Sequence, residues 1–253
     1  MRTSLQASRR AVAATLLGAA ILGTAACGAS ASSSPAGSNT TATASASGNP
    51  LAGLTADQIA SKATADLKAV SSVHIAGSAA DSGQTFVMNL TIGAKGCQGT
   101  LTVKGEGSFA LLKIGPSFWI KPDDQFWKYA AGSSADAAVM AIVAGKYIAP
   151  SAKDSSLSAL GTLCDPGQFA SSFGSQITGV VKGKTTTIAG QPALQLTDTG
   201  DTDSAYVSIS ARPEFLRLDG GSASQLAFTD YNAPLALTPP PASETLDGAK
   251  YGF

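Results

Sequence analysis

The sequence predicts an α+β domain in which one curled antiparallel sheet of about ten or eleven strands is covered by helices. Three observations lead to this prediction. An amphipathic helical pattern opens the domain, two series of short strand-like runs follow it, and a group of short helical patterns separates the two series. All of these patterns fall within residues 51–235, a length that suits a single hydrophobic core.

The first helix is expected to start after Thr55 and to end near Val70. Thr55 and Gln58 have the spacing of a capping box, in which each side chain bonds the backbone N–H of the other residue. Apolar residues then recur at helical spacing, at Ile59, Ala63, Leu67 and Val70. This apolar face is small, which favours packing against a sheet.

The residues after this helix alternate with a period of two and form short runs separated by glycine-containing turns. The expected strands are 73–79, 85–92, 100–104, 108–114 and 118–121. The turns have the length of hairpin connections, so neighbouring strands are predicted to pair antiparallel in a meander.

The middle of the domain is predicted to be helical, and strand patterns resume after it. The expected helices are 125–129, 135–143, 156–163 and 166–173. The expected strands of the second series are 177–181, 185–188, 193–197, 205–209, 214–218 and 225–231. The last residues, 236–253, include three consecutive prolines and are expected to lie loosely on the surface.

The N-terminus has the features of an export signal, predicted to span residues 1–26. Arg2, Arg9 and Arg10 precede an apolar run at 11–22 that is too short for the roughly 20 residues needed to span a bilayer. Small residues then lead into Cys27. This arrangement resembles the bacterial lipobox, in which the cysteine thiol is lipidated before the peptide is cleaved in front of it.

Two features of this signal leave alternatives open. Thr24 stands where a lipobox usually has an aliphatic residue, so ordinary signal cleavage with an incidental thiol at Cys27 is the other interpretation. Arg9 and Arg10 form a weak twin-arginine pattern, although we expect the general export route. Lipidation of Cys27 would add two or three acyl chains, which suffice for stable anchoring.

The mature chain would therefore consist of a lipidated Cys27, a tether and a domain. Residues 28–50 are almost all small and polar, so they cannot bury enough apolar surface to fold. A flexible tether of about 23 residues would span roughly 25–30 Å on average. The predicted location is the extracytoplasmic face of the cell membrane, with the domain held there as a monomer.

The charge balance excludes nucleic acid as a partner. The chain has 17 basic and 17 acidic residues, and cleavage of the signal would remove three arginines and no acid. No cluster of lysine or arginine is left in the remaining chain, whereas binding to phosphates requires clustered positive charge. The predicted contact with the membrane is therefore the lipid anchor.

Cys97 and Cys164 remain as an even pair in an oxidising compartment, so we predict a disulfide between them. It would close a loop of about 67 residues, which the chain-entropy model values at roughly 4 kcal/mol. Two buried thiols or a metal site are the alternatives. A metal site would need more ligands, and His74 is the only histidine, so we expect no metal and no other cofactor.

Four segments resemble the LppX/LprG group of envelope lipoproteins, within the LolA-like superfamily. They are Cys27 with its tether, residues 65–77 (ADLKAVSSVHIAG), residues 97–107, and the strand 118–122 followed by Phe126 and Trp127. The resemblance implies an incomplete barrel whose concave side is covered by helices. It also implies that the domain binds or carries a lipid or glycolipid between sheet and helices, although no ligand-contacting residue can be assigned.

The sequence shows no catalytic motif, and the chain is not expected to be an enzyme. His74 lies within a strand pattern, where a histidine is usually structural, and adjacent Asp123 and Asp124 suit helix capping better than acid–base chemistry. Trp119, with Phe126 and Trp127, is expected in the core rather than in a stacking site. The alternative function is a protein-interaction or sensory module with the same fold and no lipid cavity.

Overall fold

The computed structural model describes residues 48–81, 83–132, 137–150, 160–161, 163–174, 177–200, 203–221 and 224–250. The predicted signal peptide, Cys27 and nearly all of the tether lie outside these residues, so those expectations stay predictions. The described residues belong to one compact unit, Ala46–Phe253, which contains its own sheet and hydrophobic core.

Helix α1 (Ala56–Lys68) forms where the sequence predicts it, because both of its signals are present in three dimensions. Thr55 Oγ1 accepts a hydrogen bond from the Gln58 N–H, and Gln58 Oε1 accepts one from the Thr55 N–H, which completes the capping box. The apolar stripe is buried from Ile59 to Leu67. It packs against the sheet, where α1 contacts β7 and β10.

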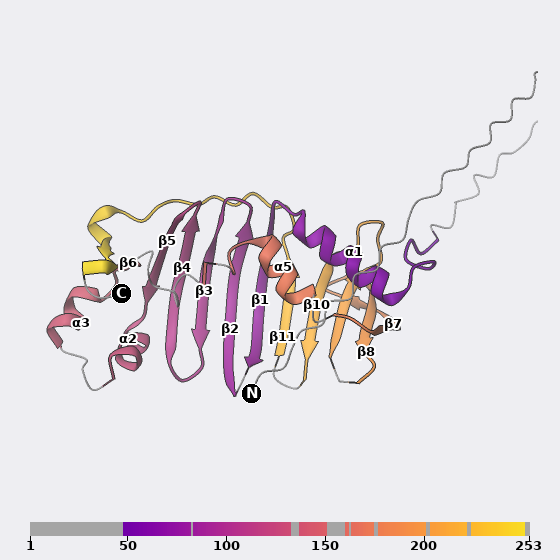
Figure 1. Cartoon of the computed structure of the whole chain (residues 1–253), viewed down its shortest axis with the longest axis horizontal. Coiled ribbons are helices and arrows are strands. Elements are labelled where there is room, and N and C mark those ends of the chain that lie inside the picture. The colour runs from indigo at the N-terminus through magenta and orange to yellow at the C-terminus, as the bar shows by residue number, and fades with distance from the viewer. Residues whose placement is uncertain are drawn as a thin grey trace, which may run out of the picture. The chain divides into compact units, whose positions relative to one another are not determined.

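A single twelve-stranded sheet forms the frame of the molecule (Figure 1). The first series comprises β1 (Ser72–Asp81), β2 (Gln84–Gly93), β3 (Gly96–Val103), β4 (Gly107–Ile114), β5 (Ser117–Pro122) and β6 (Tyr147–Ala149). The second comprises β7 (Val180–Ile188), β8 (Gln191–Asp198), β9 (Ser204–Ser208), β10 (Phe215–Gly220), β11 (Ser224–Thr229) and β12 (Thr245–Asp247).

Strands β1–β5 form the predicted meander, and β6 extends it at the edge. Strands β7–β11 form a second meander, and the two series meet at a junction between distant parts of the chain. The spatial order is β12-β6-β5-β4-β3-β2-β1-β11-β10-β9-β8-β7. Strand β1 pairs antiparallel with β11, from His74 opposite Thr229 to Ser78 opposite Gln225. The order along the sheet therefore follows the chain within β1–β6 and within β7–β11, but not across the whole sheet.

Strand β7 is one element where the sequence suggests two strands, 177–181 and 185–188. Its pairing with β8 moves from Lys182 opposite Leu196 to Thr185 opposite Leu194, which leaves one extra residue on β7. Gly183 lies within this bulge. A bulge interrupts the alternation of a strand without ending it, which explains the false break.

Helices α2 (Asp124–Ala131), α3 (Ala137–Val143) and α5 (Pro166–Gly174) lie in the predicted helical middle. The expected helix at 156–163 falls largely outside the described residues. Helices α1 and α5 contact each other and lie across one face of the sheet, here called the core face; the opposite face is called the outer face (Figure 1). The predicted fold class, a curled and open antiparallel sheet with helices, is confirmed.

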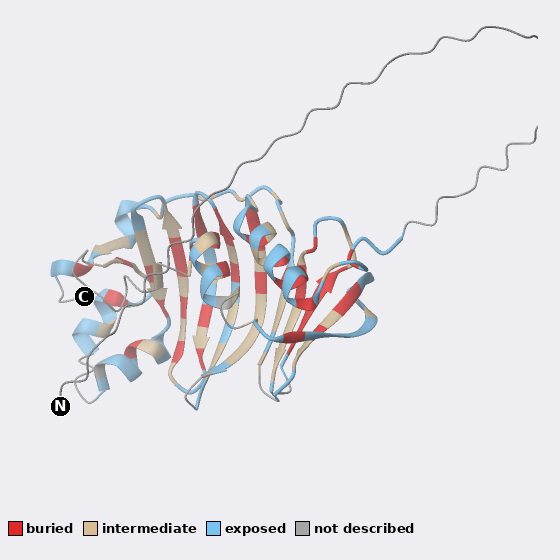
Figure 2. Ribbon diagram, turned by 45° about the vertical axis from the view of Figure 1, so that its right-hand side comes forward, coloured by how far each residue is buried: buried red, intermediate tan, exposed pale blue. Residues whose placement is uncertain are grey.

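The hydrophobic core lies on the core face and includes buried residues of α1, α2, α3 and α5, and Figure 2 shows buried residues on strands along the sheet. Phe215 and Phe228 are fully buried at its centre, with ring centroids 6.2 Å apart. Phe169 of α5 reaches Phe228 at 6.4 Å. The middle of the core face is thus packed rather than hollow.

The expectation of a loose tail at 236–253 is wrong for the part that the structure describes. Leu237 packs close to Gly96, which has no side chain, and the Lys146 ammonium donates a hydrogen bond to the Ser243 carbonyl oxygen. Strand β12 then pairs in parallel with β6. Both strands contain three residues, too few to display a period of two, so the sequence did not reveal either.

Candidate functional site

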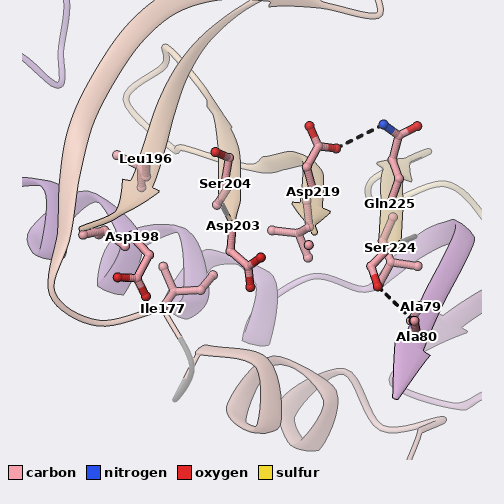
Figure 3. Close-up of a pocket in the computed structure, with 15 residues that line it drawn as sticks. Ala79, Ala80, Ile177, Leu196, Asp198, Asp203, Ser204, Asp219, Ser224 and Gln225 are labelled. Atoms are coloured by element: carbon pink, nitrogen blue, oxygen red, sulfur yellow. Dashed lines mark hydrogen bonds between the residues drawn. The ribbon is translucent and has the colours of Figure 1, made fainter. Parts of the chain in front are cut away.

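A pocket of about 310 Å³ opens on the core face, at the end of the sheet where β8 turns into β9 and β10 into β11 (Figure 3). Ala79 of β1 lies at one side of it, and Ile177 and Val180, around the start of β7, lie at the other. The pocket therefore lies at one end of the packed core rather than through its centre.

The floor of this pocket is a row of apolar side chains from four neighbouring strands. Leu196 pairs with Ala205, Ala205 with Leu218, and Leu218 with Leu226. Side chains in register on neighbouring strands point to the same face. The hydrophobic alternation of β8, β9, β10 and β11 therefore produces one continuous apolar strip.

The mouth of the pocket is polar and includes two aspartates. Asp198 ends β8 and Asp203 precedes β9, and in Figure 3 both carboxylates lie on the same side as Ile177. Asp219 points to the other side, where it accepts hydrogen bonds from Arg217 at 2.8 Å and Gln225 at 3.1 Å. The pocket thus combines an apolar floor with an acidic mouth.

The chemistry of this arrangement suits binding. An apolar concavity with a few polar groups at its mouth is the usual form of a small-molecule site. Among the described residues, no group of three or more His, Cys, Asp or Glu side chains is placed to hold a metal ion. Within the same residues, no helix is long and apolar enough to cross a bilayer.

His74 lies on the outer face, since Val73 and Ile75 beside it are buried in the core. Its Nδ1 is 3.0 Å from Thr229 Oγ1, and its Nε2 is 2.9 Å from Asn89 Oδ1. The imidazole therefore links the side chains of the two strands that flank β1. These contacts are those of a structural histidine.

Asp123 is the N-cap of α2, as the sequence predicts. Its Oδ1 accepts a hydrogen bond from the Phe126 N–H at 2.7 Å, and its Oδ2 accepts one from the Ser108 hydroxyl at 2.7 Å. Burial acts to raise the pKa of this carboxyl, but the hydrogen bonds from Phe126 and Ser108 outweigh it and lower the pKa. Asp123 therefore joins α2 to β4.

The aromatic group of the sequence is divided between the two faces of the sheet. Trp127 is buried, and Phe126 packs edge-on against Phe109 at 5.3 Å, so both contribute to the core. Trp119 pairs with Leu112, whereas the neighbouring Ile120 belongs to the core face. The expectation of core packing therefore holds for Trp127 and Phe126, while Trp119 lies on the outer face.

The structure brings Cys97 of β3 and Cys164, just before α5, together in a disulfide, with Cα atoms 5.1 Å apart. Both residues are buried. Cys27, the predicted lipid attachment site, lies outside the described residues. The pocket residues were not predicted, because only the register of β8–β11 reveals that their alternating apolar residues form one floor.

Comparison with known proteins supports the fold. No protein-family model matches the sequence, and no curated protein matches it. The crystal structure of LprF from Mycobacterium bovis matches 73% of this chain and 96% of that chain, with a TM-score of 0.51 at 12% sequence identity. The Pseudomonas aeruginosa MucA/MucB complex matches 70% of this chain and 55% of that chain at 13% identity, but its TM-score of 0.28 is too low to indicate a shared fold. The similarity to LprF shows the fold alone.

Proposed function

We propose that this protein is a lipid-anchored envelope lipoprotein whose domain binds or carries a hydrophobic ligand, a lipid or glycolipid, in the pocket at the end of the core face. The observation that carries the proposal is the apolar row Leu196–Ala205–Leu218–Leu226, which is open at a polar mouth. The resemblance of the sequence to LolA-like envelope lipoproteins supports the same function.

The volume of the pocket limits what it holds. Ligand pockets in proteins usually measure about 300–1,000 Å³. At about 310 Å³ this pocket accepts a single chain, or one chain of a larger lipid, rather than an entire multi-chain molecule. Because phenylalanines fill the core beyond the pocket, the rest of a larger lipid would project through the mouth.

The lipid anchor and the tether would keep the pocket close to the membrane. A lipidated Cys27 would hold the protein at the membrane, and residues 28–50 would let the domain move over the lipid surface. A domain with this freedom is suited to accept a chain from one site and release it at another.

Native mass spectrometry with lipid extraction tests the proposal directly. The chain from Ala46 to Phe253, exported by its own host behind a cleavable signal peptide and then purified, is expected to carry one lipid per molecule. An unliganded mass, together with no uptake of fluorescent fatty acid or acylglycerol, would favour the interaction or sensory module instead.

A tryptophan placed in the pocket provides the mutational test. Ala79 lines the pocket, whereas Ala76 lies on the same strand with its side chain on the outer face. Ala79→Trp is expected to fill the pocket and weaken ligand binding more than about tenfold, a loss of about 1.4 kcal/mol. Ala76→Trp is the matched control and should bind as the wild type does. Equal affinity of the two variants, with both shown to be folded by thermal unfolding, would place the ligand elsewhere.

A further inference from the structure

The two aspartates at the mouth of the pocket have no cationic partner among the described residues. The Asp198 N–H donates to the Asp203 carbonyl oxygen at 3.2 Å, which holds both residues at the same turn. Each carboxylate accepts one backbone hydrogen bond through Oδ1, Asp198 from Gly200 at 2.9 Å and Asp203 from Gly221 at 3.0 Å. Within the described part of the chain, both Oδ2 atoms are left available to a ligand.

Nothing in the lining compensates for this negative charge. The residues that line the pocket include no lysine, arginine or histidine. Arg217 of β10 lies on the outer face, where it pairs with Asp219 and stacks over the ring of Tyr206 at 4.2 Å. The mouth of the pocket therefore has an acidic character.

We infer that the pocket selects amphiphiles whose head group is uncharged or cationic and carries hydrogen-bond donors, and that it disfavours anionic head groups. The inference rests on the proposed function, because a chain lying on the apolar row would place its head group beside Asp198 and Asp203. A hydroxyl or ammonium group there donates to the free Oδ2 atoms. A carboxylate or phosphate meets two like charges, and such juxtaposition opposes binding.

Three ligands of one chain length test this selectivity: laurate, dodecylamine and monolauroylglycerol. Their affinities for the chain Ala46–Phe253 are measured by isothermal titration calorimetry at low salt, below their micellar concentrations. Dodecylamine and monolauroylglycerol are expected to bind about tenfold more tightly than laurate, or better. The advantage of dodecylamine should shrink in about 1 M salt, where the Debye length falls to about 3 Å.

Two paired variants assign the selectivity to the mouth. The first is a double variant, Asp198→Asn and Asp203→Asn, which removes both negative charges. It keeps the side-chain oxygens that accept hydrogen bonds from the Gly200 and Gly221 N–H groups. Laurate should then bind as well as monolauroylglycerol, while dodecylamine loses its advantage. Asp124→Asn with Glu244→Gln removes two exposed acids outside the pocket and should leave all three affinities unchanged.

The outcomes separate this inference from the function on which it rests. If all three ligands bind equally to the wild type, the pocket binds chains but the acidic mouth selects nothing, and the inference is overturned. If none of them binds, the proposed function fails together with it. If the control pair alters selectivity as much as the Asp198 and Asp203 pair, overall charge and not the mouth is responsible, and the inference is again overturned.

Discussion

Glu214 lies in the connection from β9 to β10 and is partly buried. Burial, and then the negative charge of Asp66 on α1, raise the pKa of its carboxyl. The Tyr231 hydroxyl donates a hydrogen bond to the Phe215 carbonyl oxygen at 2.7 Å. The pKa of Tyr231 is raised too, mainly by burial and also by the negative charge of Glu214. The junction of helix and sheet therefore contains two like charges that oppose each other.

The raised pKa of Glu214 gives a pH dependence with a defined sign. A carboxyl whose pKa is higher in the folded protein holds its proton more tightly there, so stability falls as pH rises from the unfolded pKa to the folded one. Glu214→Gln is expected to raise the free energy of unfolding at pH 7 by about 0.2–0.5 kcal/mol, the size of one like-charge pair.

Urea unfolding at pH 7 and below pH 4 checks this prediction. The stabilisation should vanish at the lower pH, where the carboxyl of the wild type is also neutral. Glu244→Gln, at an exposed site, serves as the control and should change stability at neither pH. A gain from Glu214→Gln that persists at low pH would show that charge is not its cause.

At the scale of single elements, α1 depends on its cap more than on the burial of large side chains. Its stripe between Ile59 and Leu67 contains Ala60 and Ala63, so each turn contributes little apolar area. Thr55→Ala removes one hydrogen bond of the capping box and is expected to cost about 1 kcal/mol. Thr55→Ser keeps the acceptor and should cost only a fraction of that.

The measurement for this prediction is the urea midpoint of each variant at unchanged m-value, since a changed m-value would mean that the folded or unfolded state itself had altered. Equal midpoints for the alanine and serine variants would contradict the capping role of Thr55. Because α1 covers the core face, the alanine variant should also lower the protection of its amides from hydrogen exchange.

Elements with strong local signals could be predicted from the sequence, and those without them could not. Helix α1 has a cap and a regular apolar spacing, and its observed bounds differ from the prediction by only one or two residues. Strands β6 and β12 have three residues each and are held by their mutual pairing, which no local pattern expresses. Gly183 interrupts the alternation of β7, so the sequence pattern predicts two strands where the structure has one.

At the scale of the whole molecule, the contacts that join the two series of strands are made by residues far apart in the sequence. The pairing of β1 with β11 joins residues about 150 positions apart and converts two meanders into one sheet. Local alternation predicts that β8, β9, β10 and β11 each have an apolar face, but not that these faces are aligned. The pocket arises from that alignment, so it belongs to the part of the structure that sequence patterns do not contain.

The disulfide between Cys97 and Cys164 joins parts that the sheet itself keeps apart. Cys97 belongs to β3 in the first series, whereas Cys164 precedes α5, which contacts α1 and whose Phe169 reaches Phe228 of β11 in the second series. The bridge spans 67 residues and therefore restricts the unfolded chain strongly. Replacing both cysteines by alanine is expected to lower the free energy of unfolding by about 4 kcal/mol.

Urea unfolding with and without dithiothreitol tests this last prediction. Reductant should destabilise the wild type by nearly the same amount as the double substitution and should leave the double variant unchanged. Iodoacetamide added to the urea-unfolded, unreduced chain Ala46–Phe253 should label neither cysteine, since this chain contains only Cys97 and Cys164. Labelling of both would mean that the pair is reduced in the native protein. In that case the position of α5 over the sheet would depend on packing against α1 and the phenylalanine core alone.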